Sequence, residues 1–189
     1  MQVTRLAIPE VVLVRPKRHG DARGYFVESF NARSFEAATG LSPVFVQDNE
    51  ALSAQVGTVR GLHFQRHPTA QGKLVRAVQG AIFDVAVDIR TGSPTFGRHV
   101  SATLTAETGD QLWVPPGFAH GYCTVEPDSV IAYKVTDFYS AADDGGIAWD
   151  DAALGIAWPL AGEPLLSDKD RRQPKLADLP PTFTYEGSK

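Results

Sequence analysis

The chain has 189 residues, 43% of them hydrophobic, and a formal net charge of -4; these values favour one hydrophobic core and argue against a general nucleic-acid-binding protein. A single cysteine, Cys123, excludes a disulfide framework, and residues 1–9 lack the basic segment and long apolar run of a signal peptide. We therefore expect one domain covering residues 1–189, located in the cytoplasm, without bound nucleic acid and without a membrane span.

Short runs of β-branched and aromatic residues, separated by glycine, proline and aspartate, dominate the chain and predict strands. In chain order, the predicted strands cover residues 11–14, 23–30, 43–47, 56–64, 74–78, 81–89, 99–105, 111–114 and 130–135. A turn is expected at His19–Asp21, between the first two strands. Many short strands with regular turn residues predict an all-β, antiparallel sandwich or jelly-roll barrel, whose mouth is the natural pocket.

One short helix and a long tail depart from this pattern. Asn31 can cap a helix that runs to about Ala38, and Gly40 can end it. After Tyr139 the composition shifts toward alanine, aspartate, glycine and tryptophan. We expect the chain from about residue 140 to wrap around the barrel.

Gly109, Pro115, Gly117 and His120 match the pattern G-x5-P-x-G-x2-H at every fixed position. Together with an earlier motif around Gly57 and His63, this pattern resembles the two halves of a cupin site. The first half keeps Gly57 and His63, but Gln65 stands where a metal-binding cupin has its second histidine, and the acidic ligand that should follow is missing. Because a divalent ion bound by imidazole needs three or four nitrogen or carboxylate ligands, we expect no metal. His63 is then free to act as a base.

Five further motifs follow one another along the chain: Arg23-Gly24-x-Phe26-x-Glu28, Gln47-Asp48-Asn49, Arg60-Gly61-Leu62-His63-Phe64-Gln65, Pro115-x-Gly117-Phe118-Ala119-His120-Gly121 and Leu166-Ser167-x-Lys169-Asp170. In these motifs and in their order, the chain resembles the dTDP-4-dehydrorhamnose 3,5-epimerase family. The resemblance implies a jelly-roll cupin fold, a dTDP-linked 4-keto-6-deoxyhexose as substrate, no cofactor, and a place in dTDP-rhamnose biosynthesis. It also implies a homodimer in which the Arg23–Glu28 strand crosses to the neighbouring subunit.

The chemistry of such a substrate indicates which groups are needed. A ketone at C4 acidifies the hydrogens on C3 and C5, so inversion needs a base, an acid on the opposite face, and a positive charge or donor at the ketone oxygen. His63 is the predicted base, because an unperturbed imidazole has a pKa of about 6.5. Asp170 is preferred as its carboxylate partner, with Asp84 as the alternative. The resemblance implies Lys73 at the oxygen and Tyr133 as the proton donor.

The substrate-binding residues are also implied by the resemblance. No G-x4-G-K-[ST] phosphate loop occurs, so side chains must hold the diphosphate, and guanidinium groups suit phosphate oxygens. The implied diphosphate-side residues are Arg23, Arg60 and Lys169. The implied contacts to base, sugar or pocket are Phe26, Glu28, Gln47, Asn49, His120 and Tyr139. Asp144 stands where the family usually has glutamate, which keeps the carboxylate but shortens its reach.

Three other functions are compatible with parts of this pattern. An epimerase that inverts only C3 or only C5 would share the same motifs. A non-catalytic cupin that binds a sugar nucleotide would not need His63, Lys73 and Tyr133 together. A metal-dependent cupin oxygenase or isomerase is disfavoured by Gln65.

Overall fold

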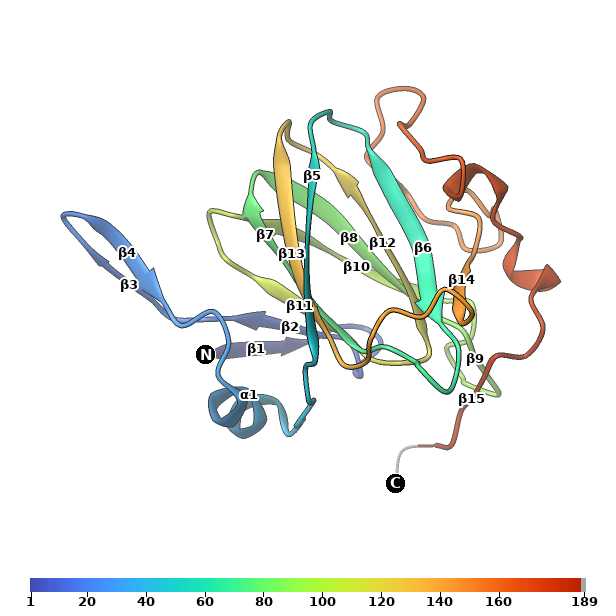
Figure 1. Ribbon diagram of the computed structural model, residues 1–189, viewed down its shortest axis with the longest axis horizontal. Coiled ribbons are helices and arrows are strands. Elements are labelled where there is room, and N and C mark those ends of the chain that lie inside the picture. Colours follow the sequence, from blue (N-terminus) through green and yellow to red (C-terminus); the bar gives the residue numbers. More distant parts are fainter. Residues whose placement is uncertain (188–189) are drawn as a thin grey trace.

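The computed structural model describes residues 1–187, which form two facing sheets of mainly antiparallel strands (Figure 1). The six-stranded sheet has, in spatial order, β1 (Gln2–Arg5), β2 (Val12–Arg15), β11 (Gln111–Val114), β7 (Lys73–Gln79), β13 (Ser129–Val135) and β5 (Gln47–Ser53). The five-stranded sheet has β10 (His99–Thr105), β8 (Ala81–Asp88), β12 (Phe118–Thr124), β6 (Val59–Gln65) and β14 (Asp144–Gly146). This arrangement confirms the predicted all-β jelly-roll class.

Smaller elements complete the described chain. They are the antiparallel hairpin of β3 (Arg18–Asp21) and β4 (Gly24–Val27), helix α1 (Ala32–Thr39), the 3-10 helices η1 (Asp170–Arg172) and η2 (Leu176–Asp178), and the parallel pair of β9 (Arg90–Thr91) and β15 (Phe183–Thr184). The predicted helix is confirmed: the Asn31 side chain accepts from Ser34 N at 3.1 Å, and Gly40 ends the helix with φ 76°. No helix in the described part of the chain has the length and apolarity needed to cross a bilayer.

The central strands β8, β11 and β12 are buried on both sides, because other parts of the chain cover both faces of the sheets there. Residues such as Val75, Ile82 and Ile131 form the core between the sheets. Leu62 and Val85 belong to a second cluster, on which the tail after β14 packs. A third cluster lies where α1 covers the six-stranded sheet: Val12, Val14, Phe35, Leu74 and Trp113. The tail therefore wraps the five-stranded sheet, next to β6 and β14 (Figure 1).

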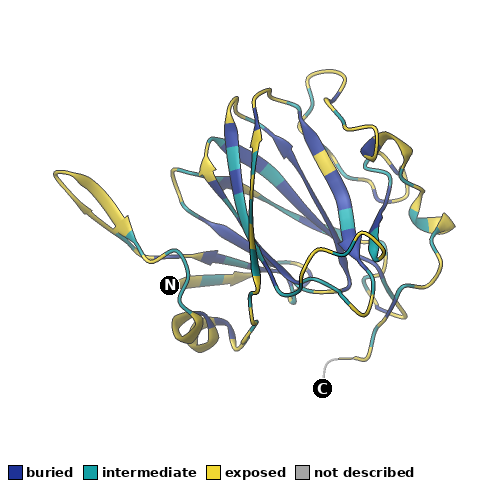
Figure 2. Ribbon diagram, viewed as in Figure 1, coloured by how far each residue is buried: buried dark blue, intermediate teal, exposed yellow. Residues whose placement is uncertain are grey.

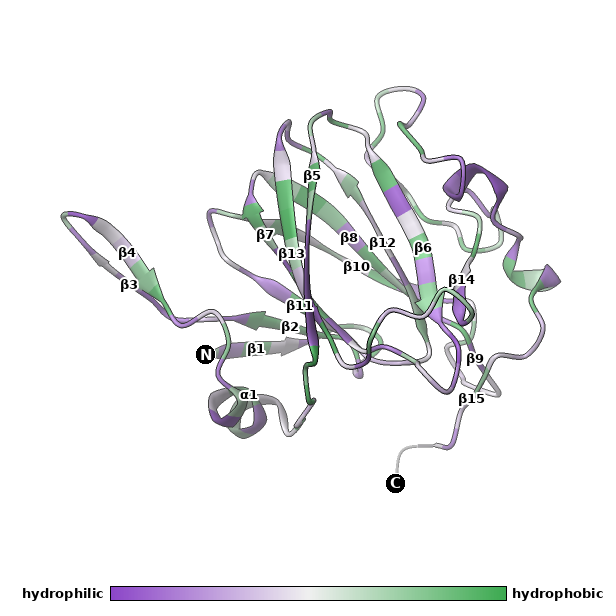
Figure 3. Ribbon diagram, in the orientation of Figure 1, coloured by the Kyte–Doolittle hydropathy of each residue, from purple (hydrophilic) through white to green (hydrophobic). Residues whose placement is uncertain are grey.

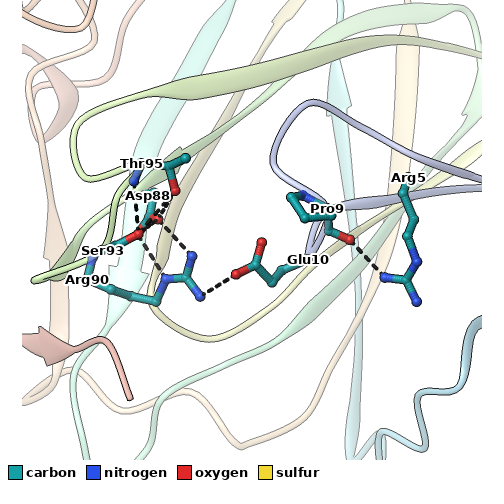
Figure 4. A network of polar contacts seen from close by, with 7 residues as sticks. All are labelled: Arg5, Pro9, Glu10, Asp88, Arg90, Ser93 and Thr95. Atoms are coloured by element: carbon teal, nitrogen blue, oxygen red, sulfur yellow. Dashed lines mark hydrogen bonds and ion pairs between the residues drawn. The ribbon is translucent and has the colours of Figure 1, made fainter. Parts of the chain in front are cut away.

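A network of polar contacts surrounds Asp88, the last residue of β8 (Figure 4). The Asp88 carboxylate is 0% exposed and accepts from the Arg90 guanidinium at 2.7 and 2.9 Å and from the hydroxyls of Ser93 and Thr95 at 2.6 Å each. Arg90 also contacts Glu10 at 3.1 Å. Because every charge in the network has partners, burying it does not leave an uncompensated ion.

Three predictions about local structure were wrong. His19–Asp21 belongs to strand β3 and pairs with residues 24–26, so the turn lies at residues 22–23. Residues 43–46 are not a strand; Phe45 instead packs against Trp113 at a centroid distance of 6.1 Å. β12 was not predicted as a strand, although all of its residues are buried.

The β3–β4 hairpin (residues 18–27) stands apart from the two sheets, and most of its residues are exposed (Figure 2). Tyr25 and Phe26 expose 59% and 71% of their surface. At its base, Arg18 donates to the main-chain oxygens of Ala106 and Glu107 and lies 4.1 Å from the centre of the Tyr25 ring. A two-stranded hairpin alone is only marginally stable in water, so this one is a natural segment for contact with another molecule.

Candidate active site

A cavity of about 430 Å³ opens between the two sheets where β6 and β12 face β13 and β7. Its walls carry His63, Lys73, His120, Tyr133 and Asp170, which are side chains suited to acid–base chemistry. Hydrophilic and hydrophobic residues alternate in bands along β6, as Figure 3 shows. The remaining lining residues are Ala51, Thr58, Val59, Arg60, Tyr122, Leu165, Leu166 and Ser167.

The two histidines of the cavity are neighbours because β6 and β12 pair with His63 opposite His120. The strands approach unusually closely at Gly61, which has φ 141°. A Cβ atom there would lie 2.5 Å from the Cα of Gly121 and 3.1 Å from the main-chain oxygen of His120. Glycine is therefore needed at this crossing, since it lacks the Cβ atom and tolerates the positive φ.

His63 forms a pair with Asp170. Its Nε2 lies 2.5 Å from Asp170 Oδ1, and the Asp170 side chain is only 3% exposed. Ser167 Oγ donates to the other carboxylate oxygen at 2.9 Å and accepts from Asp170 N at 3.1 Å. Burial disfavours the charged form of Asp170, but the hydrogen bonds from His63 and Ser167 outweigh it, so the pKa of Asp170 lies below its usual value.

The tail brings Asp170 to the barrel. Leu165 exchanges main-chain hydrogen bonds with Gly57 and Val59, at 3.0 Å each, and pairs with Thr58 in a parallel bridge. Helix η1 then begins at Asp170, beside β6. A residue far from His63 in sequence is thus fixed next to its ring.

The second aspartate that could have held His63 instead contacts His120. Asp84 Oδ1 lies 2.6 Å from His120 Nε2, and the Asp84 side chain is 0% exposed. Asp84 comes from β8, the strand that pairs with β12 on the side opposite β6. Of the two alternatives for a partner of His63, the geometry therefore selects Asp170.

Lys73 supplies a buried cation between these pairs. It begins β7, and its Nζ donates to the main-chain oxygen of His63 at 3.3 Å. Burial lowers the pKa of Lys73 to about 8, although the carboxylates of Asp84 and Asp144 oppose this effect. At neutral pH, Lys73 therefore still carries its charge in a buried position, where electrostatic interactions are stronger than at the surface.

Two tyrosines face the cavity from opposite sheets. Tyr133 lies on β13, and burial raises the pKa of its phenol, although the charge of Arg60 opposes the shift. Tyr122 lies on β12 and is 5% exposed; burial raises its pKa to about 12. Both phenols are thus protonated at neutral pH. Arg60 borders them, with Nε 3.1 Å from Ser53 Oγ.

A smaller hollow of about 180 Å³ adjoins the main cavity and shares His63, Lys73 and Tyr133 with it. Five predicted substrate-binding residues line it: Gln47, Asn49, Tyr139, Asp144 and Lys169. Gln47 Nε2 donates to Asn49 Oδ1 at 2.8 Å, and Lys169 forms an ion pair with Asp144. The structure thus brings these residues to one side of the catalytic candidates.

Three predicted substrate-binding residues do not reach this site within the chain. Arg23 and Phe26 lie on the exposed β3–β4 hairpin, and Glu28 follows it. The Arg23 side chain is 90% exposed and contacts Asp21 at 2.5 Å. None of the three lines either hollow.

Gln65 stands where a metal-binding cupin has its second histidine, and its side-chain amide is hydrogen-bonded within the chain. It is 4% exposed, and both ends of its amide are hydrogen-bonded to the segments that follow β6 and β13. Within the described residues, no group of three or more histidine, cysteine, aspartate or glutamate side chains is placed to hold a metal ion.

Sequence reasoning missed Ser167 and Tyr122 as parts of the site. Ser167 lies three residues before Asp170, and serine at that spacing commonly caps the first turn of a helix, which was the available signal. Tyr122 follows the Pro-x-Gly-x-x-His motif by two residues, on the same face of β12 as His120.

Comparison with known proteins identifies the family. The family model "dTDP-4-dehydrorhamnose 3,5-epimerase" matches residues 5–178. A protein of that name from Sinorhizobium fredii is 57% identical over 188 residues, covering 98% of this chain and 94% of the relative.

Solved structures agree in fold. The crystal structure of dTDP-6-deoxy-D-glucose-3,5-epimerase from Legionella pneumophila Philadelphia 1, in complex with dTDP-4-keto-L-rhamnose, has a TM-score of 0.94 and 41% identity, covering 98% of this chain and 99% of that chain. A 3'-monoepimerase from Streptomyces bikiniensis, in complex with dTDP-quinovose, has a TM-score of 0.86 and 36% identity, covering 94% and 88%. The matches confirm the resemblance predicted from the motifs: the chain belongs to the dTDP-4-dehydrorhamnose 3,5-epimerase family.

Proposed function

We propose that this protein inverts C3 and C5 of dTDP-4-dehydro-6-deoxy-D-glucose to give dTDP-4-dehydro-L-rhamnose. The observation that carries the proposal is the placement of His63, Lys73 and Tyr133 around one cavity, with His63 paired to a buried carboxylate. A protein that only bound the nucleotide would not need a base and an acid on facing walls. Proton transfer breaks and re-forms C–H bonds without a net redox change, so the reaction requires no redox cofactor.

His63 is the base in this mechanism. The Asp170 carboxylate can only accept, so it fixes the proton of the neutral ring on Nε2 and leaves Nδ1 to take the proton from C3 or C5. When the C–H bond breaks, its electron pair moves to the C4 oxygen and an enolate forms. Asp170 then stabilises the imidazolium, as carboxylates do in other histidine–carboxylate pairs.

Lys73 and Tyr133 act on the enolate. The buried Lys73 cation stabilises the negative charge on the C4 oxygen, with His120 as a further donor of the pocket. Tyr133 lies on the facing sheet and delivers its phenolic proton to the carbanion carbon from the opposite side. The phenolate then regains a proton from solvent and the His63 imidazolium releases one to it, so that both groups are restored before the sequence is repeated at the second carbon.

The nucleotide is bound by residues of two chains in this proposal. Arg60 and Lys169 face the diphosphate, and Gln47 and Asn49 offer amides to sugar or base. Arg23, Phe26 and Glu28 complete the site of a second subunit through the protruding β3–β4 hairpin, which makes the active form a homodimer. The exposed aromatic rings of the hairpin and its distance from its own cavity support this arrangement. A nucleotide-sugar substrate also favours a cytoplasmic location.

Proton NMR in deuterated water, with dTDP-4-keto-6-deoxyglucose as substrate, tests the function. Deuterium at both C3 and C5 is the expected result. Deuterium at one carbon would identify a mono-epimerase, an alternative supported by the likeness to the Streptomyces bikiniensis 3'-monoepimerase. Binding without any exchange would refute the enzymatic proposal in favour of a non-catalytic sugar-nucleotide-binding protein.

A further inference from the structure

The side-chain amide of Gln65 joins three parts of the chain near the site. Its Nε2 donates to the main-chain oxygens of Thr69 at 2.7 Å and Phe138 at 3.0 Å, while its Oε1 accepts from Ser140 N at 2.9 Å. The residue is 4% exposed. An amide is suited to this place because it offers donors on one end and an acceptor on the other.

Asp143 extends these contacts. One of its carboxylate oxygens accepts from Thr69 Oγ1 at 2.7 Å and from Ser140 Oγ at 2.8 Å, and these hydrogen bonds lower the pKa of Asp143. Its main-chain oxygen accepts from Arg66 N at 2.9 Å. The segment from Phe138 to Asp143 is therefore hydrogen-bonded at several points to the end of β6 and the loop that follows it. Gln65 is the most buried of the residues whose side chains make these contacts.

This segment forms one wall of the smaller hollow. Tyr139 lies between Phe138 and Ser140, which are both hydrogen-bonded to the Gln65 side chain. The main-chain N of Tyr139 donates to Gln47 Oε1 at 3.1 Å. Asp144 pairs with Gln65 in the β14–β6 register and also lines the hollow. Because the Tyr139 side chain is exposed, its place depends on the main chain on either side of it.

We propose that Gln65 is a positioning residue: by fixing residues 138–144, its amide sets how well Tyr139 and Asp144 meet the substrate. Gln65 takes no part in proton transfer. The proposal rests on the proposed function for the identity of the substrate. It predicts that changes at Gln65 act on substrate affinity more than on the rate of the bound complex.

Gln65→Glu is the main test, because a carboxylate of nearly the same shape cannot donate to Thr69 O or Phe138 O. We expect KM to rise by about 10-fold or more, with kcat within about 3-fold of the wild-type value. Gln65→Met has no donor and no ionisable group, and it should show the same rise. Gln79→Glu is the matched control: its amide also donates to a main-chain oxygen, that of Asp128 at 2.9 Å, and it lies outside the site.

Two readouts separate this role from general weakening of the fold. A protonated carboxyl group regains one donor, so the KM ratio of Gln65→Glu to wild type should fall as the pH is lowered from about 8 to about 6. In a double-mutant cycle, Tyr139→Ala should raise KM less in the Gln65→Met background than in the wild type, because the ring is already displaced. If Gln65→Glu does not fold, the Gln65→Met cycle decides the question.

The proposal is overturned by unchanged KM in both variants, by a loss confined to kcat, or by full additivity with Tyr139→Ala. If the wild-type protein catalyses no exchange, the proposed function fails separately. The dissociation constant for dTDP-glucose, measured by calorimetry, then decides the role of Gln65: a rise of about 10-fold in Gln65→Met supports it, and no change overturns it.

Discussion

Replacing Asp170 by asparagine should inactivate His63 while leaving the fold in place. The contacts of Ser167 determine which end of the asparagine amide faces His63. Ser167 Oγ accepts from Asp170 N and donates to Oδ2. An asparagine amide would therefore turn its oxygen to Ser167 and its NH2 group to His63. His63 Nε2 would have to accept, which shifts the ring proton to Nδ1 and blocks the proposed base.

The size of the effect follows from the contacts. Losing a hydrogen bond between charged partners costs about 1.5–3 kcal/mol, which corresponds to roughly 10- to 150-fold in rate. The Asp170 side chain is 3% exposed and its Oδ1 lies 2.5 Å from His63 Nε2, so solvent cannot replace it. The wrong tautomer adds to this loss; the same change in a serine protease lowers kcat about 10⁴-fold. We expect kcat to fall between about 10² and 10⁴-fold.

The assay is deuterium exchange at C3 and C5 followed by NMR, with circular dichroism to verify the fold. Adding Ser167→Ala to Asp170→Asn frees the amide to rotate and should restore about 5-fold or more of the lost rate, because the correct tautomer becomes accessible again. Exchange by Asp170→Asn within about 3-fold of the wild-type rate would refute the pairing of Asp170 with the base. A double variant no faster than Asp170→Asn would refute the tautomer argument.

Three further predictions follow from the site. Tyr133→Phe should slow inversion, measured as product formation, more than deuterium uptake; equal losses would contradict its role as the acid. The rate should decline as the pH rises through about 8, where Lys73 loses its charge. The Lys73→Met variant should be slow at every pH, and its rate should not show this decline. A decline of the same kind in Lys73→Met would contradict the assignment of the pH dependence to Lys73. Gly61→Ala places a Cβ atom 2.5 Å from Gly121 Cα, at a residue whose φ is 141°. It should therefore destabilise the fold by about 2–5 kcal/mol and lower Tm in thermal denaturation by roughly 5–20 °C. An unchanged Tm would contradict the close approach of the two strands.

Much of the fold could be predicted because most strands are apolar runs between turn residues. The predicted bounds of β10 and β11 agree with the structure. β12 was missed because Gly117 and Gly121 resemble turn residues, whereas Gly121 is needed where β12 meets Gly61. β5 was misplaced because its exposed face is polar, with Asp48 and Glu50 pointing outward, so its apolar content is low.

The site was predictable to the extent that its residues lie on the barrel strands. His63 and His120 are neighbours because of the β6–β12 register, and Tyr133 faces the same cavity from β13. The sequence favoured Asp170 over Asp84 as the partner of His63, and the structure confirms this choice, which depends on where the tail after β14 runs. The role of Gln65 could not be predicted from sequence, because it depends on loops that close over it.

Deuterium exchange by His63→Ala tests the central claim most directly. With dTDP-4-keto-6-deoxyglucose in deuterated water, the wild-type protein should place deuterium at C3 and C5, and folded His63→Ala should place it at neither carbon. The Asp170 carboxylate would lose its imidazole partner but keep Ser167, so the fold should persist. Exchange at either carbon by His63→Ala, at a rate near that of the wild type, would contradict the assignment of His63 as the base.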